Sequence, residues 1–260
     1  MLRKLFPSRG AAAPPSAGSV LPGQRIYAIG DIHGRLDLLD DLLKAIDADD
    51  ATRPEAETML LFLGDLIDRG PQSAQVVERL LDLKRARPTT RLLLGNHEEV
   101  FLTVLAGDIE ALKFFCRIGG RETILSYGFS EAEYHQLDYS ELLAQLLPRV
   151  PAAHRTFLES FEDLIVMGDY AFVHAGVRPS EGLDRQKASD LRWIRREFLE
   201  HRGGFEKVIV HGHTISDEVE ILPHRIGLDT GAYASGLLSA MGFEGSERWL
   251  VQARGQRSGR

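Results

Sequence analysis

The sequence has little of what several protein classes depend on. It contains one cysteine, Cys116, so no disulfide can form within the chain, and both a disulfide-stapled fold and a four-cysteine zinc site are excluded. No apolar run approaches the ~20 residues that a membrane-spanning helix needs, so we expect no membrane partner. Basic residues are outnumbered by acidic ones, 31 to 38, and the net charge of −7 argues against nucleic-acid binding.

The middle of the chain has the composition of an ordinary globular domain, whereas its two ends are basic. With 43% hydrophobic and 27% charged residues over 260 positions, the chain is long enough for one large domain. We predict a flexible basic N-terminal tail over 1–24, a domain over 25–251 and a basic C-terminal tail over 252–260. The N-terminal segment lacks the apolar stretch of a secretory signal, so we expect a cytoplasmic protein.

Short apolar runs alternate with amphipathic helical patterns, which predicts an α/β fold. Between residues 98 and 161 the pattern is helical throughout, so we expect a helical insertion between two strands of the scaffold. The predicted strands are Arg25–Ile29, Thr58–Leu63, Thr90–Leu94, Tyr170–Val173, Lys207–Val210 and Arg225–Leu228.

Five of the predicted strands end in a loop that combines glycine with Asp, Asn or His. The loops read GDIHG (30–34), GDLIDRG (64–70), GNHE (95–98), HAG (174–176) and HGHT (211–214). Ligands of open α/β sheets bind outside the carboxyl ends of the strands, so we expect these loops to converge on one rim. Glycine beside each polar residue lets the backbone turn sharply and approach an ion closely.

The residue types on this rim predict a metal site. Asp, His and Asn without Cys form a mixed nitrogen and oxygen site that suits manganese, iron or zinc. The potential ligands are too many for one catalytic ion, and they fit two ions that share a bridging carboxylate. Two ions ~3.5–4 Å apart promote in-line displacement at phosphorus, with a metal-activated hydroxide as the nucleophile. Arg69 offers a fork that suits phosphate oxygens, so the residues predict a phosphoester hydrolase.

The five motifs, in this order, resemble those of the phosphoprotein phosphatase family, a branch of the calcineurin-like metallophosphoesterases. The resemblance runs over residues 25–251. The segments Leu191–Arg195 and Leu228–Ala232 resemble those of the bacterial and phage lambda-type members. The resemblance implies a sandwich of two mixed β-sheets packed face to face, with helices outside.

The resemblance also implies a role for each site residue. Of the matching residues, His97 would be the general acid toward the leaving oxygen, and Asp68 would orient it. Two divalent ions are implied, manganese first, with iron, zinc or nickel as alternatives. The implied ligands are Asp31, His33 and Asp65 for the first ion, Asp65, Asn96, His174 and His213 for the second, with Arg69, Arg195 and Asn96 on the phosphoryl group.

Two substrate classes remain open from the sequence. The first is phosphoserine and phosphothreonine in a phosphoprotein or phosphopeptide, with phosphotyrosine and phosphohistidine as alternatives. The second is a dinucleoside polyphosphate or small phosphoester. Symmetrical diadenosine tetraphosphate hydrolases usually lack an aspartate matching Asp68, so its presence favours the first class. No feature of the sequence points to a regulatory partner.

Several residues near the motifs keep more than one interpretation. We expect His213 rather than its neighbour His211 to be the ligand, and Arg178 is a weaker candidate for a substrate contact. Asp229 is either a partner of a ligand histidine or a turn former. The histidines outside the motifs are expected at the surface: His135, His154, His201 and His224.

Cys116 lies in an apolar helical pattern and is expected in the core. A thiol-dependent tyrosine phosphatase needs an arginine six positions after its cysteine, and that position holds Glu122. The spacing therefore excludes this chemistry.

Overall fold

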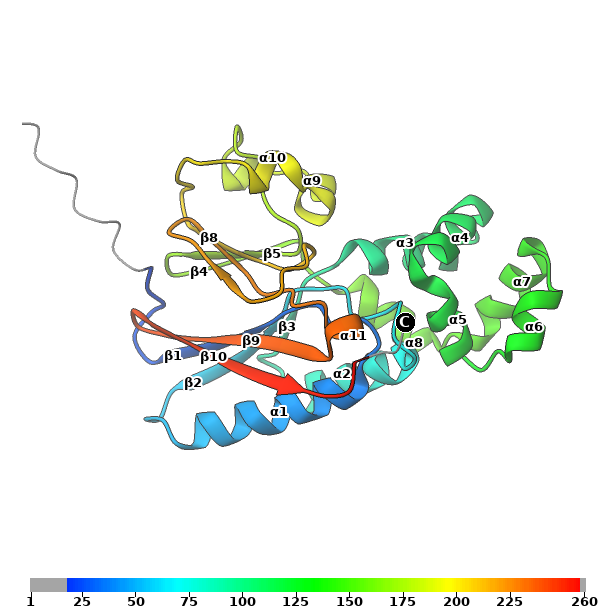
Figure 1. Cartoon of the computed structure of the whole chain (residues 1–260), viewed down its shortest axis with the longest axis horizontal. Coiled ribbons are helices and arrows are strands. Elements are labelled where there is room, and N and C mark those ends of the chain that lie inside the picture. Colours follow the sequence, from blue (N-terminus) through cyan, green and yellow to red (C-terminus); the bar gives the residue numbers. More distant parts are fainter. Residues whose placement is uncertain (1–17, 258–260) are drawn as a thin grey trace, which may run out of the picture.

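The computed structural model describes residues 18–257 and arranges them in four layers. Two five-stranded sheets pack face to face, and helices cover their outer faces (Figure 1). This confirms the predicted α/β sandwich of two mixed sheets. Among the described residues, no helix is both long and apolar enough to cross a membrane.

The first sheet has the strand order β10-β9-β1-β2-β3. Strands β1, β2 and β3 run parallel, and β3 forms one edge of the sheet. Strand β9 is antiparallel to β1 and forms a hairpin with β10. The strands are β1 (Gln24–Ile29), β2 (Glu57–Phe62), β3 (Arg91–Leu92), β9 (Leu237–Glu244) and β10 (Glu247–Arg254).

The second sheet has the order β4-β5-β6-β8-β7, with β5, β6 and β8 parallel and an antiparallel strand at each edge. Because parallel strands end at the same edge, the loops after β5 and β6 leave the sheet side by side. The strands are β4 (Leu164–Met167), β5 (Tyr170–Val173), β6 (Val208–His211), β7 (Glu220–Ile221) and β8 (Arg225–Gly227).

Strand β1 shows how the layers are held together. Successive side chains of a strand point to opposite faces. Ile26 and Ala28 therefore pack between the two sheets, whereas Tyr27 and Ile29 pack against the helices of the outer layer. All four are completely buried, which fixes the end of β1, and the loop that follows it, in the middle of the molecule.

The outer helices differ between the two sheets. Figure 1 shows α1 and α2 below the first sheet and α9 and α10 above the second. Short helical turns complete the connections near the strand ends. Their bounds are α1 (Leu36–Ala51), α2 (Ser73–Ala86), a 3₁₀ turn η2 (Leu183–Arg185), α9 (Ala188–Trp193), α10 (Arg196–Leu199) and α11 (Ala232–Ser235).

Between β3 and β4 the chain forms helices and one isolated bridge, Leu93 to Glu162. These helices make a lobe beside the sandwich, seen in green at the right of Figure 1. They correspond to the stretch 98–161 in which the sequence shows only helical periodicity. Their bounds are α3 (Asn96–Leu105), α4 (Ile109–Phe115), a π-helical turn η1 (Cys116–Gly120), α5 (Arg121–Ser126), α6 (Glu131–Gln136), α7 (Tyr139–Arg149) and α8 (Ala152–Glu159).

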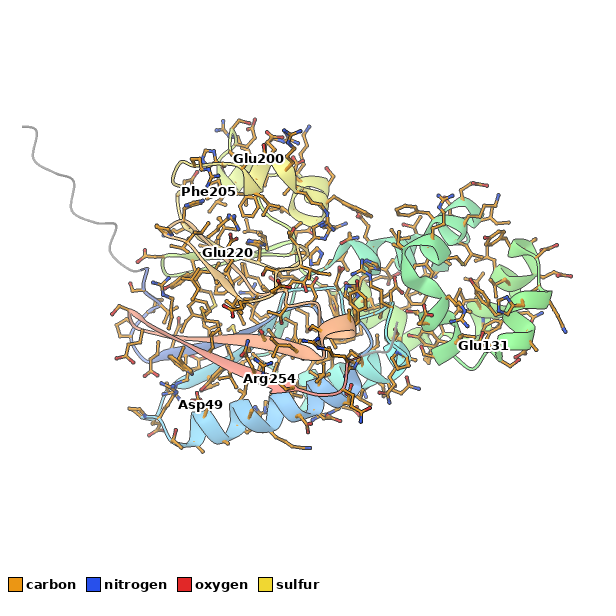
Figure 2. The ribbon with its side chains drawn as sticks, viewed as in Figure 1. Asp49, Glu131, Glu200, Phe205, Glu220 and Arg254 are labelled. Atoms are coloured by element: carbon orange, nitrogen blue, oxygen red, sulfur yellow. The ribbon has the colours of Figure 1, made fainter. Side chains whose placement is uncertain are left out.

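The structure corrects both predicted tails. The last part of the predicted N-terminal tail is packed: Val20 is buried, and Ser19 donates from its backbone and its hydroxyl to Asp169 at 3.1 and 3.0 Å. Strand β10 continues to Arg254 (labelled in Figure 2), so the first residues of the predicted tail 252–260 are strand. The remainder of these predictions, over 1–17 and 258–260, lies outside the described residues.

Candidate active site

The five predicted loops converge at one place between the sheets. Asp31 and His33 follow β1, Asp65 follows β2, and His174 and His213 follow β5 and β6. The remaining loop, after β3, leads directly into α3, whose first two residues are Asn96 and His97. Every one of the six predicted ligands is buried, with at most 5% of its surface exposed. The structure thus brings the whole predicted ligand set together.

The backbone of these loops is strained. Among the described residues, five that are not glycine have a positive φ, and all five belong to the predicted site: His33, Asp65, Asp68, Arg69 and His213. This conformation is uncommon for residues with a Cβ atom and persists where the surroundings impose it, most often at functional sites. Holding these side chains in place therefore costs the fold some stability.

Two histidines are held in the same way, and this sets which nitrogen is available. The Nδ1 atoms of His33 and His174 contact the carbonyl oxygens of Ile67 and Leu63, each at 2.7 Å. A carbonyl can only accept, so Nδ1 carries the proton in both rings and Nε2 keeps a lone pair. Both Nε2 atoms face Asp65, at 3.5 and 3.4 Å from its carboxylate oxygens.

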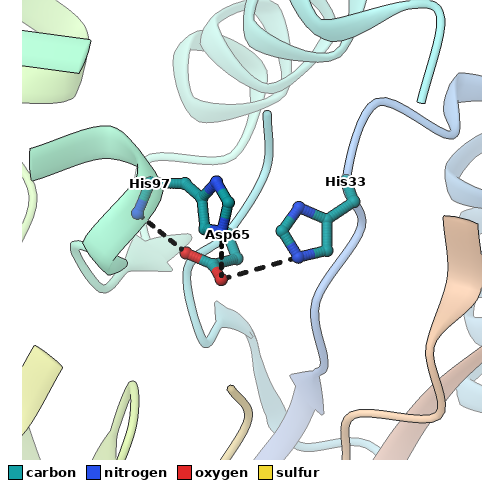
Figure 3. Close-up of side chains that lie close together, drawn as sticks. All are labelled: His33, Asp65 and His97. Atoms are coloured by element: carbon teal, nitrogen blue, oxygen red, sulfur yellow. Dashed lines mark hydrogen bonds and ion pairs between the residues drawn. The ribbon is translucent and has the colours of Figure 1, made fainter. Parts of the chain in front are cut away.

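Asp65 is shared by two clusters that are able to hold a metal ion. One consists of His33, Asp65 and His97, and the other of Asp65, His174 and His213 (the first is drawn in Figure 3). Asn96 joins the second cluster, since its Oδ1 lies 3.0 Å from Nε2 of His174. This arrangement of nitrogen and oxygen atoms around one central carboxylate suits two divalent ions bridged by Asp65.

Asp31 lies beside these clusters. Its two carboxylate oxygens accept the backbone N–H of His213 at 2.9 and 3.2 Å. Gly212 makes this approach possible, because a Cβ atom there would stand 2.0 Å from Oδ1 of Asp31. Gly95 has the same role on the other side, where a Cβ atom would lie 2.3 Å from Oδ1 of Asp65. Glycine thus lets the backbone of these loops approach the two carboxylates closely.

Protonation in the site also favours cation binding. Burial lowers the pKa of His33 and His174 and that of His213 to about 2, so these rings stay neutral and their lone pairs stay available. Burial by itself raises the pKa of Asp65, but its pKa is lowered overall, with the charge of the protonated His97 among the causes, and the carboxylate remains ionised. Neutral imidazoles around an ionised carboxylate are ligands in their binding form.

His97 and Asp68 form a hydrogen-bonded pair next to the clusters. Nδ1 of His97 lies 2.5 Å from Oδ2 of Asp68, and both side chains are buried. Burial lowers the pKa of His97, but Asp65 and Asp68 raise it by more, so the imidazole holds its proton more firmly than a free histidine. A protonated imidazole whose other nitrogen is held by a carboxylate has the form of a general acid.

The structure places one of the two predicted phosphate-binding arginines in contact with the clusters. The guanidinium of Arg69 contacts Nε2 of His33 at 2.6 Å and Nε2 of His97 at 2.9 Å, and it lies over the ring of Tyr233. Arg195 is exposed just before α10. Burial is the largest cause that lowers the pKa of His174, and the charge of Arg195 lowers it slightly further.

Arg178 is paired with acidic side chains outside the two clusters. Its guanidinium is held by Asp190, at 2.8 and 2.6 Å, and by Glu197 at 2.8 Å. His154 also departs from expectation, because it is 3% exposed and is bonded to the hydroxyl of Tyr127 and to Glu78.

Sequence reasoning missed the residues that support the loops. Glu98 is fully buried and its carboxylate accepts four backbone N–H groups, those of Asp65, Leu66, Ile67 and Gly95, at 2.8 to 3.3 Å. The sequence does contain a signal for Glu98, because this charged residue is the last one of the GNHE motif and directly follows His97. Glu98 ties the Asp65 loop to the start of α3 and so fixes the bridging carboxylate.

Comparison with known proteins agrees with this geometry. Residues 24–252 match the family described as calcineurin-like phosphoesterase, and the chain belongs to this family. It is therefore a metallophosphoesterase, a hydrolase of phosphate esters.

Its relatives carry two kinds of name. It is 35% identical over 155 residues to a symmetrical bis(5'-nucleosyl)-tetraphosphatase of Methylococcus capsulatus; this covers 60% of the chain but only 44% of that relative. It is 27% identical to an asymmetrical bis(5'-nucleosyl)-tetraphosphatase of Anoxybacillus flavithermus, over 83% of the chain and 89% of the relative. It is 29% identical to serine/threonine-protein phosphatase 2 of Escherichia coli, over 83% and 91%.

A solved structure described as that of a candidate diadenosine tetraphosphatase is similar over 92% of this chain and 100% of its own. Its identity is 25% and its TM-score is 0.62. The family and the fold are thus common to relatives with different substrates.

Proposed function

We propose that this protein is a metal-dependent phosphomonoester hydrolase that acts on phosphoserine and phosphothreonine in proteins. The observation that carries the proposal is the buried pair of His97 and Asp68, with Nδ1 and Oδ2 2.5 Å apart. The similarity to the Escherichia coli serine/threonine phosphatase over most of both chains supports it.

The metal site consists of Asp31, His33 and Asp65 on one side and of Asp65, Asn96, His174 and His213 on the other. Two divalent ions, manganese first and iron, zinc or nickel as alternatives, would supply an activated water and polarise the phosphoryl group. The close approach of the backbone at Gly212 and Gly95 to the carboxylates of Asp31 and Asp65 supports this ligand set.

The remaining residues bind the substrate and move a proton. Arg69 and Arg195 hold the phosphoryl oxygens, because a guanidinium presents paired donors to them. Asn96 also contacts the phosphoryl group. His97 in its imidazolium form donates the proton of its Nε2 atom to the leaving oxygen, while Asp68 accepts from Nδ1–H and so orients the charged ring and stabilises it.

The leaving group decides between the two substrate classes. A serine side chain leaves as a strongly basic alkoxide and needs a proton, so a positioned general acid is worth ~10²–10⁴-fold in rate. The departing nucleotide of a dinucleoside polyphosphate is a stable phosphate anion that leaves without one. A general acid such as His97, held by Asp68, therefore accelerates the hydrolysis of phosphoserine more than that of a dinucleoside polyphosphate.

The second candidate is hydrolysis of dinucleoside polyphosphates. It is favoured by the names of the Methylococcus and Anoxybacillus relatives, the second of which aligns over most of both chains. The presence of Asp68 weighs against symmetrical cleavage of diadenosine tetraphosphate, because the hydrolases that catalyse it usually lack an aspartate at the matching position.

The two candidates are separated by a substrate panel in Mn²⁺. We expect kcat/KM for phosphoserine and phosphothreonine peptides to exceed that for diadenosine tetraphosphate at equal protein concentration. Arg69→Ala is the matched control, because loss of a phosphoryl-binding arginine lowers hydrolysis of both kinds of substrate. Efficient hydrolysis of diadenosine tetraphosphate with negligible release of phosphate from peptides contradicts the proposal in favour of the second candidate. The cytoplasmic location and the lack of nucleic-acid and membrane partners stay predictions.

A further inference from the structure

The ends of β1 and β8 meet although the strands belong to different sheets. A Cβ atom added to Gly30, at the end of β1, would lie 2.5 Å from the carbonyl oxygen of Leu228 and 3.4 Å from the backbone nitrogen of Asp229. Asp31 and Asp229 thus follow two strand ends in direct contact. Both residues are at most 2% exposed.

Only one oxygen of Asp229 has a structural task. Its Oδ1 accepts the backbone N–H of Gly231 at 2.8 Å, in the turn that leads into α11. Its Oδ2 is buried and has no hydrogen-bond partner among residues 18–257. Forming the turn therefore explains the position of Oδ1 but not that of Oδ2. A buried carboxylate oxygen without a donor is costly unless a proton or a cation compensates it.

The neighbours of Asp229 make a cation the better explanation. Asp31, Asp65 and Asp229 are each at most 2% exposed, and Asp31 and Asp65 belong to the predicted ligand set of the first ion. Three carboxylates are thus buried at neighbouring strand ends. A divalent ion between these groups would stabilise all three in their ionised forms.

We infer that Asp229 is an additional carboxylate of the first metal site, with Oδ2 turned toward the ion that Asp31, His33 and Asp65 hold. The inference rests on the proposed two-metal site and extends its ligand environment to the end of β8. Asp229 then has two tasks, since Oδ1 shapes the turn and Oδ2 supplies charge to the ion.

Asp229→Asn tests this assignment with little disturbance. The amide has the same shape, and its oxygen still accepts the N–H of Gly231, so the turn is preserved while the negative charge is lost. The exposed Asp217→Asn is the matched control, because it changes the net charge equally from a nearby loop. Mn²⁺ is titrated calorimetrically into both metal-free variants and the wild type, and Tm is measured with and without Mn²⁺.

We expect wild type and Asp217→Asn to bind two Mn²⁺ ions alike. Asp229→Asn should bind one of the two ions ~10–100-fold more weakly, the range found for residues that support a metal ligand. Its metal-free Tm should equal or exceed that of the wild type, because a buried charge is gone, whereas the rise in Tm with Mn²⁺ should be smaller.

Wild-type Mn²⁺ affinities at both sites of Asp229→Asn would overturn the inference and leave a turn former only. If the wild type itself binds no Mn²⁺, the proposed metal site falls, and the inference with it. Should Asp229→Asn fail to fold, Asp229→Ser carries the same expectation, since a hydroxyl oxygen is able to accept from Gly231 and has no charge.

Discussion

Thr123 donates a hydrogen bond from its hydroxyl to Oδ1 of Asp68 at 2.5 Å, and the same hydroxyl accepts the backbone N–H of Asp68 at 2.9 Å. Ser73, at the start of α2, contacts this hydroxyl at 2.9 Å. Thr123 belongs to α5 in the helical lobe, whereas Asp68 lies in the loop after β2. The lobe therefore positions the carboxylate that in turn positions His97.

Removing this hydroxyl should weaken catalysis without touching the site. We expect Thr123→Val, which keeps the volume, to lower kcat on phosphoserine peptides by ~10-fold, less than the loss of a general acid costs. The free energy of unfolding should fall by about 1–3 kcal/mol, because a buried charged group loses a partner. Steady-state kinetics and urea unfolding measure the two effects.

Thr123→Ser is the control for this prediction, since it keeps the hydroxyl and loses only a methyl group. It should recover most of the lost kcat. Equal losses in the serine and valine variants would mean that Thr123 acts by packing, and an unchanged kcat in a folded Thr123→Val would remove it from the catalytic arrangement.

Replacement of His97 should affect substrates according to their leaving groups. His97→Asn should lower kcat ~10²–10⁴-fold on phosphoserine peptides and much less on p-nitrophenyl phosphate, whose nitrophenolate leaves without a proton. Asp68→Asn should show the same asymmetry in milder form, because it only orients the imidazole. Parallel assays of both variants on both substrates provide the test.

Arg69→Ala and Arg195→Ala are the comparison, since both substrates present the same phosphoryl oxygens and should be weakened alike. If His97→Asn loses equally on both substrates while its metal content stays at that of the wild type, His97 serves binding or structure and is not the acid.

Individual strands show how much of the fold is predictable from the sequence. Strands β1, β2 and β5 were predicted to within one residue at each end, because each is an apolar run that stops at a glycine or histidine loop. Strand β9 was missed. It is buried on both faces between β1 and β10, so it lacks alternation, and it contains Gly242, which reads as a turn. The structure explains that glycine, since a Cβ atom there would stand 2.2 Å from the Trp249 ring.

The candidate site divides in the same way. Asp31, His33 and the other motif residues are predictable because each lies in a segment that begins at the end of a strand, and parallel strands of the same sheet end at the same edge. Thr123 is not, because its partner Asp68 is 55 residues away and no local pattern marks a hydroxyl that reaches another element. Asp229 was left open for a related reason: the sequence cannot tell which of its two oxygens has a partner.

Removal of the metal should abolish activity reversibly. We expect a chelator to inactivate the protein and Mn²⁺ to restore it. Asp65→Ala should lose both ions because Asp65 belongs to both clusters, whereas His33→Ala should weaken mainly one. Metal content measured after dialysis, together with kcat, distinguishes the variants. Two bound ions and full activity in Asp65→Ala would contradict the bridging role.

Asp49 should make stability depend on acid pH. It lies near the end of α1 (labelled in Figure 2) and accepts hydrogen bonds from Arg53, from the hydroxyl of Tyr27 and from the indole of Trp249 at 2.5 to 2.7 Å. The bond from Arg53 is the largest cause that lowers the pKa of Asp49 to about 2. These contacts tie the helix to β1 and β10.

A carboxyl group whose pKa is lower in the folded protein stabilises the fold above its unfolded pKa of ~3.9 and loses that contribution as the pH falls toward 2. The contribution at neutral pH is on the order of 2 kcal/mol. We therefore expect Asp49→Asn to lower the free energy of unfolding at pH 7 by this amount, and the difference from wild type to shrink below pH 4. The exposed Asp41→Asn should differ little from wild type at either pH. Urea unfolding of the three proteins at both pH values measures this, and comparing variants at each pH cancels the acid sensitivity of the other carboxylates. A deficit in Asp49→Asn that stays constant down to pH 2 would show that the side chain acts through its shape and not its charge.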